Sequence, residues 1–337
     1  MKKLALFVLL LTALTLAACG NADTDNAASP ADNTKLEIYT TVYPLTYFTE
    51  RIGGDFVEVT SVYPAGANEH TFEPTQQGMI AIAEADLMFY IGLGLEGFID
   101  SAKRTLNGEE VEFVALADSI SDEQLEAALH NDGSHSEEEH EDEHEDHEDH
   151  DHGEEGAHDG HNHGSTDPHV WMSPKLSQNL ADAIKDSLIA KDPDNTEIYE
   201  TNHAALVEEL QQLDVAFSEL HERVTKDTFF VSHAAFTYLA EPYGFEQVSV
   251  AGLNSQDEPS QKELTEIVDL AHEKNIEYIV FEQNVSSNLT EVVQKEVGAE
   301  AVQMHNLGVL TQEDIDNGET YFTLMEKNLE VLETILK

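Results

Sequence analysis

Short apolar runs alternate with amphipathic segments in the first part of this chain. The runs are rich in β-branched and aromatic residues and are bounded by turn-forming residues, a pattern typical of strands. The segments between them carry apolar residues at helical spacing. The predicted strands are 36–42, 56–62, 87–91 and 111–115, and the predicted helices are 45–51 and 75–83. Strands that alternate with helices in this way favour a parallel sheet with covering helices.

A long helical stretch follows. Residues 175–224 are predicted to be helical apart from a break at Asp192-Pro193-Asp194. After the break, apolar residues recur with the helical period from 197 to 223. At about 1.5 Å per residue such a helix reaches about 40 Å, the width of a domain. We therefore expect residues 191–225 to form a helix that links two lobes.

The alternation of strands and helices resumes after this stretch. Strands are predicted at 228–232, 246–250, 278–281 and 301–304, and helices at 234–243, 260–274 and 320–336. The predicted fold class is α/β, with two lobes that each contain a mainly parallel sheet flanked by helices, joined by one long rigid helix. The N-terminal lobe is expected to span 36–190 and the C-terminal lobe 226–337.

The first residues have the pattern of a targeting signal. Two lysines precede an apolar run, 4–16, which is too short and wrongly flanked for a membrane span. The run leads into Leu-Ala-Ala-Cys-Gly, which resembles a bacterial lipobox and implies a lipoprotein signal peptide (1–19) with Cys19 as the lipid-modified residue. Residues 20–35 are rich in small polar residues and are expected to form a flexible tether. We expect an extracytoplasmic protein, anchored to the bacterial cell membrane through Cys19.

Composition and charge limit the classes of ligand. Cys19 is the only cysteine, so the mature chain has no internal disulfide and no cysteine for a metal site. The formal net charge is −52, from 68 acidic residues against 16 Lys and Arg. Proteins bind nucleic acid mainly by neutralising phosphates with Lys and Arg, so no nucleic-acid partner is expected. A cationic ligand suits the chain better.

Residues 131–163 form a run that is almost a polyelectrolyte. It contains nine histidines and fifteen acidic residues but no Lys or Arg. Imidazole is a common ligand of zinc, and a segment this polar cannot offset its ordering entropy by burial. We expect a loop that is disordered without metal and collects or senses zinc weakly; the alternative is a solubilising insertion. The accessory weak sites are expected at His140, His144, His147, His150, His152, His158, His161 and His163.

One part of this run matches the zinc-peptidase pattern H-E-x-x-H, from His140 to His144. That motif works only on a packed helix, which holds both imidazoles and the glutamate base on one face. No apolar residue occurs from 131 to 155, so no packed helix is expected there. We interpret the match as a product of composition, and the chain is not expected to be an enzyme.

Seven histidines lie outside this run and outside His130 at its edge. Three of them sit on predicted helices among charged neighbours and are expected on solvated faces: His203, His221 and His272. The other four follow or border predicted strands: His70, His169, His233 and His305. Ligands of open α/β folds gather at the carboxyl ends of strands, so these four are candidates for one site.

Several motifs occur together and in a fixed order along nearly the whole mature chain. They are Gly92-Leu93-Gly94-Leu95-Glu96, Asp192-Pro193-Asp194-Asn195, Ala251-Gly252-Leu253 and Glu258-Pro259-Ser260, with the segments around His70, His169 and His233. The set resembles the zinc-specific substrate-binding lipoproteins of ABC transporters, the helix-linked class called cluster A-I. The resemblance implies that these three histidines bind the metal between the lobes, and that a His- and acid-rich loop precedes the second of them. It also implies an ABC permease with its ATPase as partners, and a monomer is expected.

The residue types favour zinc and leave the fourth ligand open. Manganese-binding relatives carry a carboxylate at the third position, where this chain has His233, and three neutral imidazoles favour Zn²⁺ over Mn²⁺. Some close relatives place a Glu at the position of Gly308. A tetrahedral ion still needs a fourth donor. Water and Glu69 are the favoured candidates, and the others are Glu282 and His305.

Three classes of function are compatible with these features. The first is a binding protein that captures extracytoplasmic Zn²⁺ between two lobes and delivers it to an ABC permease for import. The second is a zinc hydrolase, because three histidines and a water are also the layout of a catalytic site. The third is a surface adhesin with a structural zinc. No folded segment supplies a recognisable acid or base for hydrolysis, and a lipid tether with two linked lobes favours capture and delivery.

Overall fold

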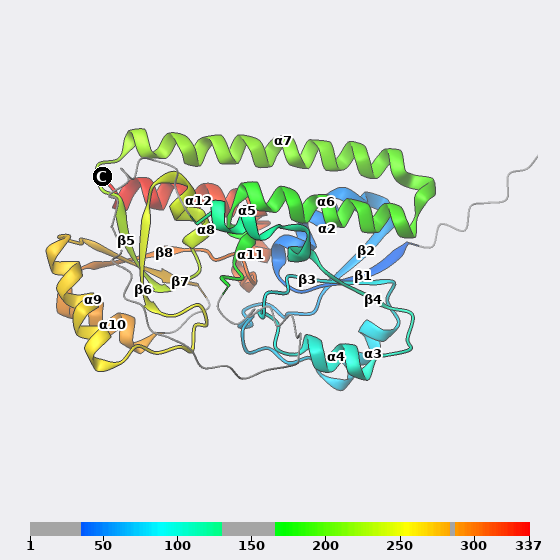
Figure 1. Ribbon diagram of the computed structural model, residues 1–337, viewed down its shortest axis with the longest axis horizontal. Helices are drawn as coiled ribbons and strands as arrows, with labels where there is room; N and C mark the ends of the chain where they lie inside the picture. Colours follow the sequence, from blue (N-terminus) through cyan, green and yellow to red (C-terminus); the bar gives the residue numbers. More distant parts are fainter. Residues whose placement is uncertain (1–34, 130–165, 284–286) are drawn as a thin grey trace, which may run out of the picture. The chain divides into compact units, whose positions relative to one another are not determined.

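Two four-stranded parallel sheets form the framework of the computed structural model, which describes residues 35–129, 166–283 and 287–337 (Figure 1). The first sheet has the strand order β2-β1-β3-β4, and all of its pairings are parallel. Its strands are β1 (Leu36–Thr40), β2 (Val57–Ser61), β3 (Leu87–Tyr90) and β4 (Glu112–Ala115). β3 is buried along its whole length, as expected for a central strand covered on both faces.

The second sheet repeats the topology of the first. Its order is β6-β5-β7-β8, again with parallel pairings only. Its strands are β5 (Thr228–His233), β6 (Glu246–Ala251), β7 (Tyr278–Glu282) and β8 (Glu300–Met304). In both sheets the first strand lies between the second and the third, which places a topological switch point beside it. The predicted α/β class with two parallel sheets is confirmed.

Two long antiparallel helices lie between the two sheets along the chain, and the second of them reaches from one lobe to the other (Figure 1). α6 (Pro174–Lys191) ends at Asp192, where Pro193 lacks the N–H needed to continue the helix, and α7 (Thr196–Leu220) then begins. The Asp192 carboxylate holds this corner, because its Oδ2 accepts hydrogen bonds from Asn195 Nδ2 at 2.6 Å and from the Tyr199 hydroxyl at 2.7 Å. α7 packs against α6, α2 and α12 (Figure 1). The predicted break in the helical stretch is confirmed.

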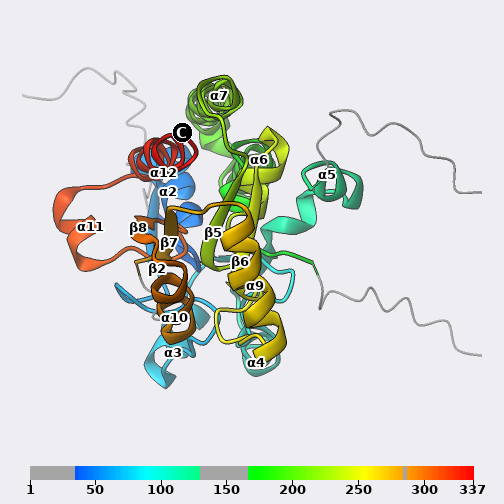
Figure 2. The same cartoon turned by 90° about the vertical axis from the view of Figure 1, so that its left-hand side faces the viewer.

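The remaining helices cover the two sheets. Figure 2 shows α7 and α12 on one side of the second sheet and α9 and α10 on the other. The helices are α2 (Tyr43–Gly53), α3 (Gln76–Ala83), α4 (Ile99–Thr105), α5 (Asp122–Ala127), α8 (Thr237–Ala240), α9 (Gln261–Glu273), α10 (Asn288–Val297), α11 (Gln312–Asn317) and α12 (Tyr321–Ile335). Short 3₁₀ turns occur at Gly54–Phe56, Leu116–Ser119, Val170–Met172, Pro193–Asn195, His221–Arg223 and Glu241–Tyr243. Within the described residues, no helix is both long and apolar enough to cross a membrane.

Four of these helices were not predicted from the sequence: α4, α5, α10 and α11. They have only six to ten residues, too few for a clear helical period. The helix predicted at 234–243 is also shorter than expected, because only Thr237–Ala240 is α-helical before a 3₁₀ turn at Glu241–Tyr243.

One hydrophobic core extends through both lobes within the compact unit 35–337. Phe48 of α2 packs edge-on against Tyr321 of α12, with ring centroids 4.9 Å apart. The Tyr321 hydroxyl donates to the carbonyl of Trp171 at 2.9 Å, and all three side chains are fully buried. A smaller core lies under α9 and α10. Since the main core is shared, the segment that carries Trp171 is held by both lobes.

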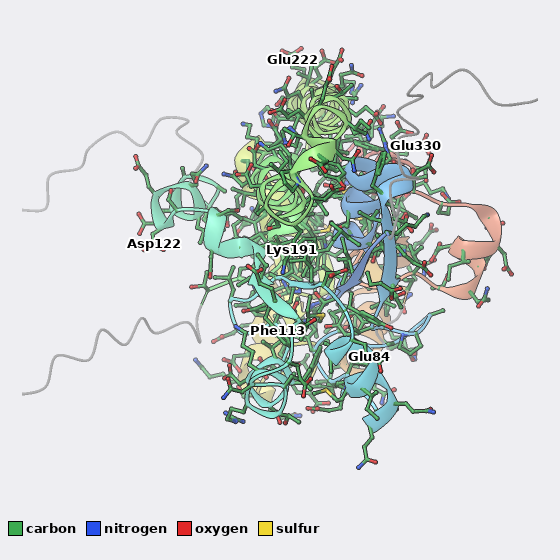
Figure 3. All side chains as sticks on the ribbon, turned by 90° about the vertical axis from the view of Figure 1, so that its right-hand side faces the viewer. Glu84, Phe113, Asp122, Lys191, Glu222 and Glu330 are labelled. Atoms are coloured by element: carbon green, nitrogen blue, oxygen red, sulfur yellow. The ribbon has the colours of Figure 1, made fainter. Side chains whose placement is uncertain are left out.

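The outside of the described region is acidic on several sides. Figure 3 shows Glu84, Asp122, Glu222 and Glu330 pointing outward from different elements, and all four are exposed. Lys191 forms an ion pair there, with its Nζ 3.1 Å from Glu112 Oε2. A surface with this sign attracts cations and repels nucleic acid.

Candidate metal centre

His70 lies in the loop between β2 and α3, close to the carboxyl end of the first sheet. The loop is held by Asn68, whose Oδ1 accepts the His70 backbone N–H at 3.0 Å. The Asn68 amide nitrogen also donates to Ser255 Oγ of the second lobe at 3.0 Å. His70 is half-buried, so this histidine is the most accessible of the group described below.

His169 lies in the segment that leads into α6, and its side chain is completely buried. Asp167 Oδ1 accepts two hydrogen bonds from it, from the backbone N–H at 2.9 Å and from ring Nδ1 at 2.7 Å. Burial opposes charge on Asp167, but the contacts with His169 outweigh this and lower the pKa of the carboxyl. A carboxylate can only accept, so Nδ1 carries the proton and Nε2 keeps a free lone pair.

His233 is the last residue of β5 and is also completely buried. The register pairs Val231 of β5 with Val280 of β7, so His233 and Glu282 leave the ends of neighbouring strands side by side. The His233 Nδ1 lies 2.6 Å from Glu282 Oε1, which also accepts from Ser232 Oγ at 2.7 Å. His233 therefore presents Nε2, as His169 does.

The three imidazoles meet at one point. The Nε2 of His169 lies 3.4 Å from the Nε2 of His70 and 3.4 Å from the Nε2 of His233. Zn–N bonds of about 2.0–2.1 Å at tetrahedral angles would separate the nitrogens by about 3.3–3.4 Å. Two imidazole nitrogens at this distance avoid lone-pair repulsion only when a proton or a metal ion lies between them. Among the described residues, these three form the one group of His, Cys, Asp or Glu whose ligand atoms all lie within 4.8 Å.

The pKa values of two of these histidines are shifted in opposite directions. Burial, followed by the neighbouring imidazoles of His169 and His233, lowers the pKa of His70 to about 3. Burial also opposes charge on His233, but Glu282 outweighs it and raises the pKa of this imidazole. The same contact lowers the pKa of Glu282, against the effect of its own burial. His70 is therefore neutral and ready to bind a metal at neutral pH, while His233 keeps its proton to a higher pH than an ordinary imidazole, so protons compete with the metal there.

Glu69 and Gly308 share one small space beside the centre. Glu69 is 3% exposed, and its Oε1 accepts a hydrogen bond from Asn306 Nδ2 at 2.9 Å. A Cβ at Gly308 would lie 2.7 Å from the same Oε1. The Glu69 carboxylate thus fills the room that a side chain at 308 would need. Glu69 does not belong to the group of three histidines within the described part of the chain.

The other two candidates for the fourth ligand have different partners. Glu282 is engaged by His233, Ser232 and Asn306, so both of its oxygens already accept hydrogen bonds. His305 Nε2 lies 3.2 Å from Asp314 Oδ2, and its Nδ1 accepts from the Leu307 backbone N–H at 2.8 Å. The structure therefore brings together three of the four histidines expected at strand ends, and leaves His305 outside.

The remaining candidate residues lie elsewhere. His221 and His272 are exposed, as predicted for solvated helix faces. His203 differs, because it is half-buried with its Nε2 3.1 Å from Asp182 Oδ1 of α6, and burial lowers its pKa. Cys19 and the accessory sites in the run 131–163 lie outside the described residues.

Sequence reasoning missed the residues that orient the three histidines. No role was predicted for Asp167 or Asn306, and Glu282 was predicted only as a possible fourth ligand. The spacing of Asp167 two residues before His169 was the available signal, because Asp often bonds the backbone two residues on. The pairing of Glu282 with His233 needs the sheet register and had no local signal.

The fold and the three imidazoles together define a two-lobed metal-binding protein whose lobes are linked by a long helix. Residues 38–335 match the family described as "Zinc-uptake complex component A periplasmic", and the chain belongs to this family. The cluster A-I resemblance is thereby confirmed.

Two relatives and one solved structure illustrate the likeness. The chain is 37% identical over 333 residues to the zinc-binding lipoprotein AdcA of Streptococcus pneumoniae, covering 98% of this chain but 60% of AdcA. It is 35% identical over 331 residues to the high-affinity zinc uptake system protein ZnuA of Bacillus subtilis, covering 98% of this chain and 97% of ZnuA. The Zn(II)-bound ZnuA-like domain of S. pneumoniae AdcA superimposes with a TM-score of 0.67 at 33% identity, covering 90% of this chain and 99% of that domain. The chain thus spans about 60% of the length of AdcA and nearly all of ZnuA.

Proposed function

We propose that this protein captures Zn²⁺ between its two lobes outside the cytoplasm and delivers it to an ABC permease, driven by its ATPase, for import. The observation that carries the proposal is the convergence of three Nε2 atoms, from His70, His169 and His233, at the spacing that tetrahedral zinc requires. The names of the relatives, a zinc-binding lipoprotein and a zinc uptake protein, support zinc as the cargo.

The fourth ligand in this proposal is a water molecule. The Glu69 carboxylate is engaged by Asn306 and packed against Gly308, which supports a position beside the zinc and not on it. A water ligand suits a carrier, since it leaves one coordination position that an incoming donor of the permease can take during release. Glu69 remains the alternative ligand, and it would have to give up its bond to Asn306.

Capture requires little rearrangement under this proposal. The lobes share a hydrophobic core, and Tyr43 N–H donates to the Gly308 carbonyl at 2.9 Å across them. The bond between Asn68 and Ser255 is a second link, close to His70. Small tilts and loop movements are expected on binding, in preference to a wide hinge closure.

The proposed function is not enzymatic, and it includes a monomer that is held at the membrane by a lipid on Cys19. The described site offers carboxylates that orient histidines, and each of these carboxylates is already hydrogen-bonded to its histidine. For the run 131–163, whose structure is not described, we propose the accessory role of collecting or sensing zinc at weak sites.

X-ray absorption of the zinc-loaded protein tests the ligand set. Three imidazole nitrogens and one oxygen at about 2.0–2.1 Å are expected. Two or fewer imidazoles would contradict the site. Delivery is tested separately in cells that lack the chain: growth in zinc-depleted medium should be restored by the wild type and not by His169→Ala. Equal restoration by both would contradict the role in import.

A further inference from the structure

Asn306 is a buried amide with every polar atom of its side chain in use. It follows β8 in the loop that contains Gly308, and it is 1% exposed. Its Nδ2 donates to Glu69 Oε1 and to Glu282 Oε2, both at 2.9 Å. Its Oδ1 accepts from the Gly308 backbone N–H at 3.0 Å and from Gln283 Nε2 at 3.2 Å. An amide has two N–H donors and two acceptor lone pairs, so the side chain is fully satisfied.

This one residue reaches the segments that carry all three histidines. Glu69 directly precedes His70, so the bond to Glu69 ties down the loop of the first ligand. Asn306 also fixes the Glu282 carboxylate, which accepts the hydrogen bond from His233 Nδ1. Its backbone carbonyl accepts from Trp171 Nε1 at 2.7 Å, two residues beyond His169.

The orientation of the amide is determined by its neighbours. Two carboxylates lie on the nitrogen side, and a backbone N–H lies on the oxygen side. A flipped amide would place its oxygen against both carboxylates, which is unfavourable in a buried site. The two N–H groups also separate Glu69 from Glu282, whose charges repel each other. An apolar side chain of the same shape could fill the space but would supply none of these contacts.

We propose that Asn306 is a positioning residue that sets zinc affinity and zinc release by holding the three ligand segments in one arrangement, although it supplies no ligand itself. The inference rests on the proposed function, because it assumes that His70, His169 and His233 bind the ion. Loss of Asn306 should loosen Glu282 behind His233 and free Glu69 beside His70. The histidines would then have to be ordered again at each binding event.

The test compares Asn306→Leu with Asn328→Leu. Asn328 is an equally buried amide that bonds the same loop, but it contacts only the backbone of His305, donating at 2.7 Å and accepting at 2.8 Å. Zinc affinity and dissociation rate are measured by competition with a chelator, and Co²⁺ absorption reports the ligand geometry. Asn306→Ser is measured in parallel, so that a folding defect of the larger side chain does not decide the result.

Asn306→Leu and Asn306→Ser should weaken zinc binding by about 10-fold, the lower end of the effect of losing a direct partner of a metal ligand, because Asn306 acts on His233 through Glu282. Both should alter the Co²⁺ spectrum, whereas Asn328→Leu should change affinity by less than about two-fold. Wild-type affinity in the Asn306 variants would overturn the inference, and so would an equal loss in Asn328→Leu. A wild type without a tight zinc site would overturn the proposed function itself.

Discussion

Replacing Glu282 with Gln isolates the carboxylate behind His233, one of the three proposed zinc ligands. The change keeps the length and shape of the side chain but removes its charge. Glu282 Oε1 lies 2.6 Å from His233 Nδ1 and also accepts from Ser232, so a neutral oxygen could still receive both bonds. The new amide group would face the Asn306 donor that Oε2 now accepts at 2.9 Å. We therefore expect a misaligned and less basic His233 in a folded protein.

The size of the effect follows from these contacts. Removing the partner of a metal-bound histidine costs about 10- to 100-fold in affinity, which corresponds to about 1.4–2.8 kcal/mol at 1.4 kcal/mol per decade. Competition titration with a zinc chelator measures the loss, and thermal unfolding of the zinc-free protein verifies that the variant is folded.

Asp314→Asn is the matched control. Asp314 also bonds a histidine, with Oδ2 3.2 Å from His305 Nε2, but His305 lies outside the group of three. Its removal should lower the stability of the protein and change zinc affinity by less than about two-fold. The reasoning is refuted if Glu282→Gln binds zinc as the wild type does, or if the control weakens binding equally.

Three further predictions concern pH, packing and the acidic run. Zinc affinity should fall from about pH 7.5 to about pH 5. Zinc must displace the proton that His233, with its raised pKa, binds as the pH falls, while His70, with its pKa near 3, contributes little above about pH 4. A titration with equal affinity at both ends would contradict this. Gly308→Ala should lower the free energy of unfolding of the zinc-free protein by about 1–3 kcal/mol, measured by urea denaturation, because the new Cβ would lie 2.7 Å from the buried Glu69 Oε1. Unchanged stability would contradict this and mean that Glu69 moves freely. Deletion of 131–163 should remove weak zinc binding but leave one tight ion, and loss of the tight ion would exclude an accessory role.

The framework of the fold could be predicted because its signals are local. Strands such as Leu87–Tyr90 are continuous apolar runs. The helix before Asp192 ends there because Pro193 has no backbone N–H with which to continue it. Helices such as Asp122–Ala127 were missed because six residues contain less than two turns.

The three histidines of the site could be predicted, but the hydrogen bonds that orient them could not. Strand ends placed His70, His169 and His233 near one another, and the family resemblance selected them over His305. The orienting contacts depend on tertiary packing. The amide of Asn306 meets Glu69 across 237 residues of sequence, a contact that a single sequence does not reveal.

Metal titration with elemental analysis tests the central claim most directly. The wild type is compared with His70→Ala, His169→Ala and His233→Ala, each dialysed against a weak chelator before its zinc content is measured. The account predicts one tightly held zinc in the wild type and its loss or severe weakening in every variant. Tight zinc that survives all three substitutions would contradict the assignment of the site.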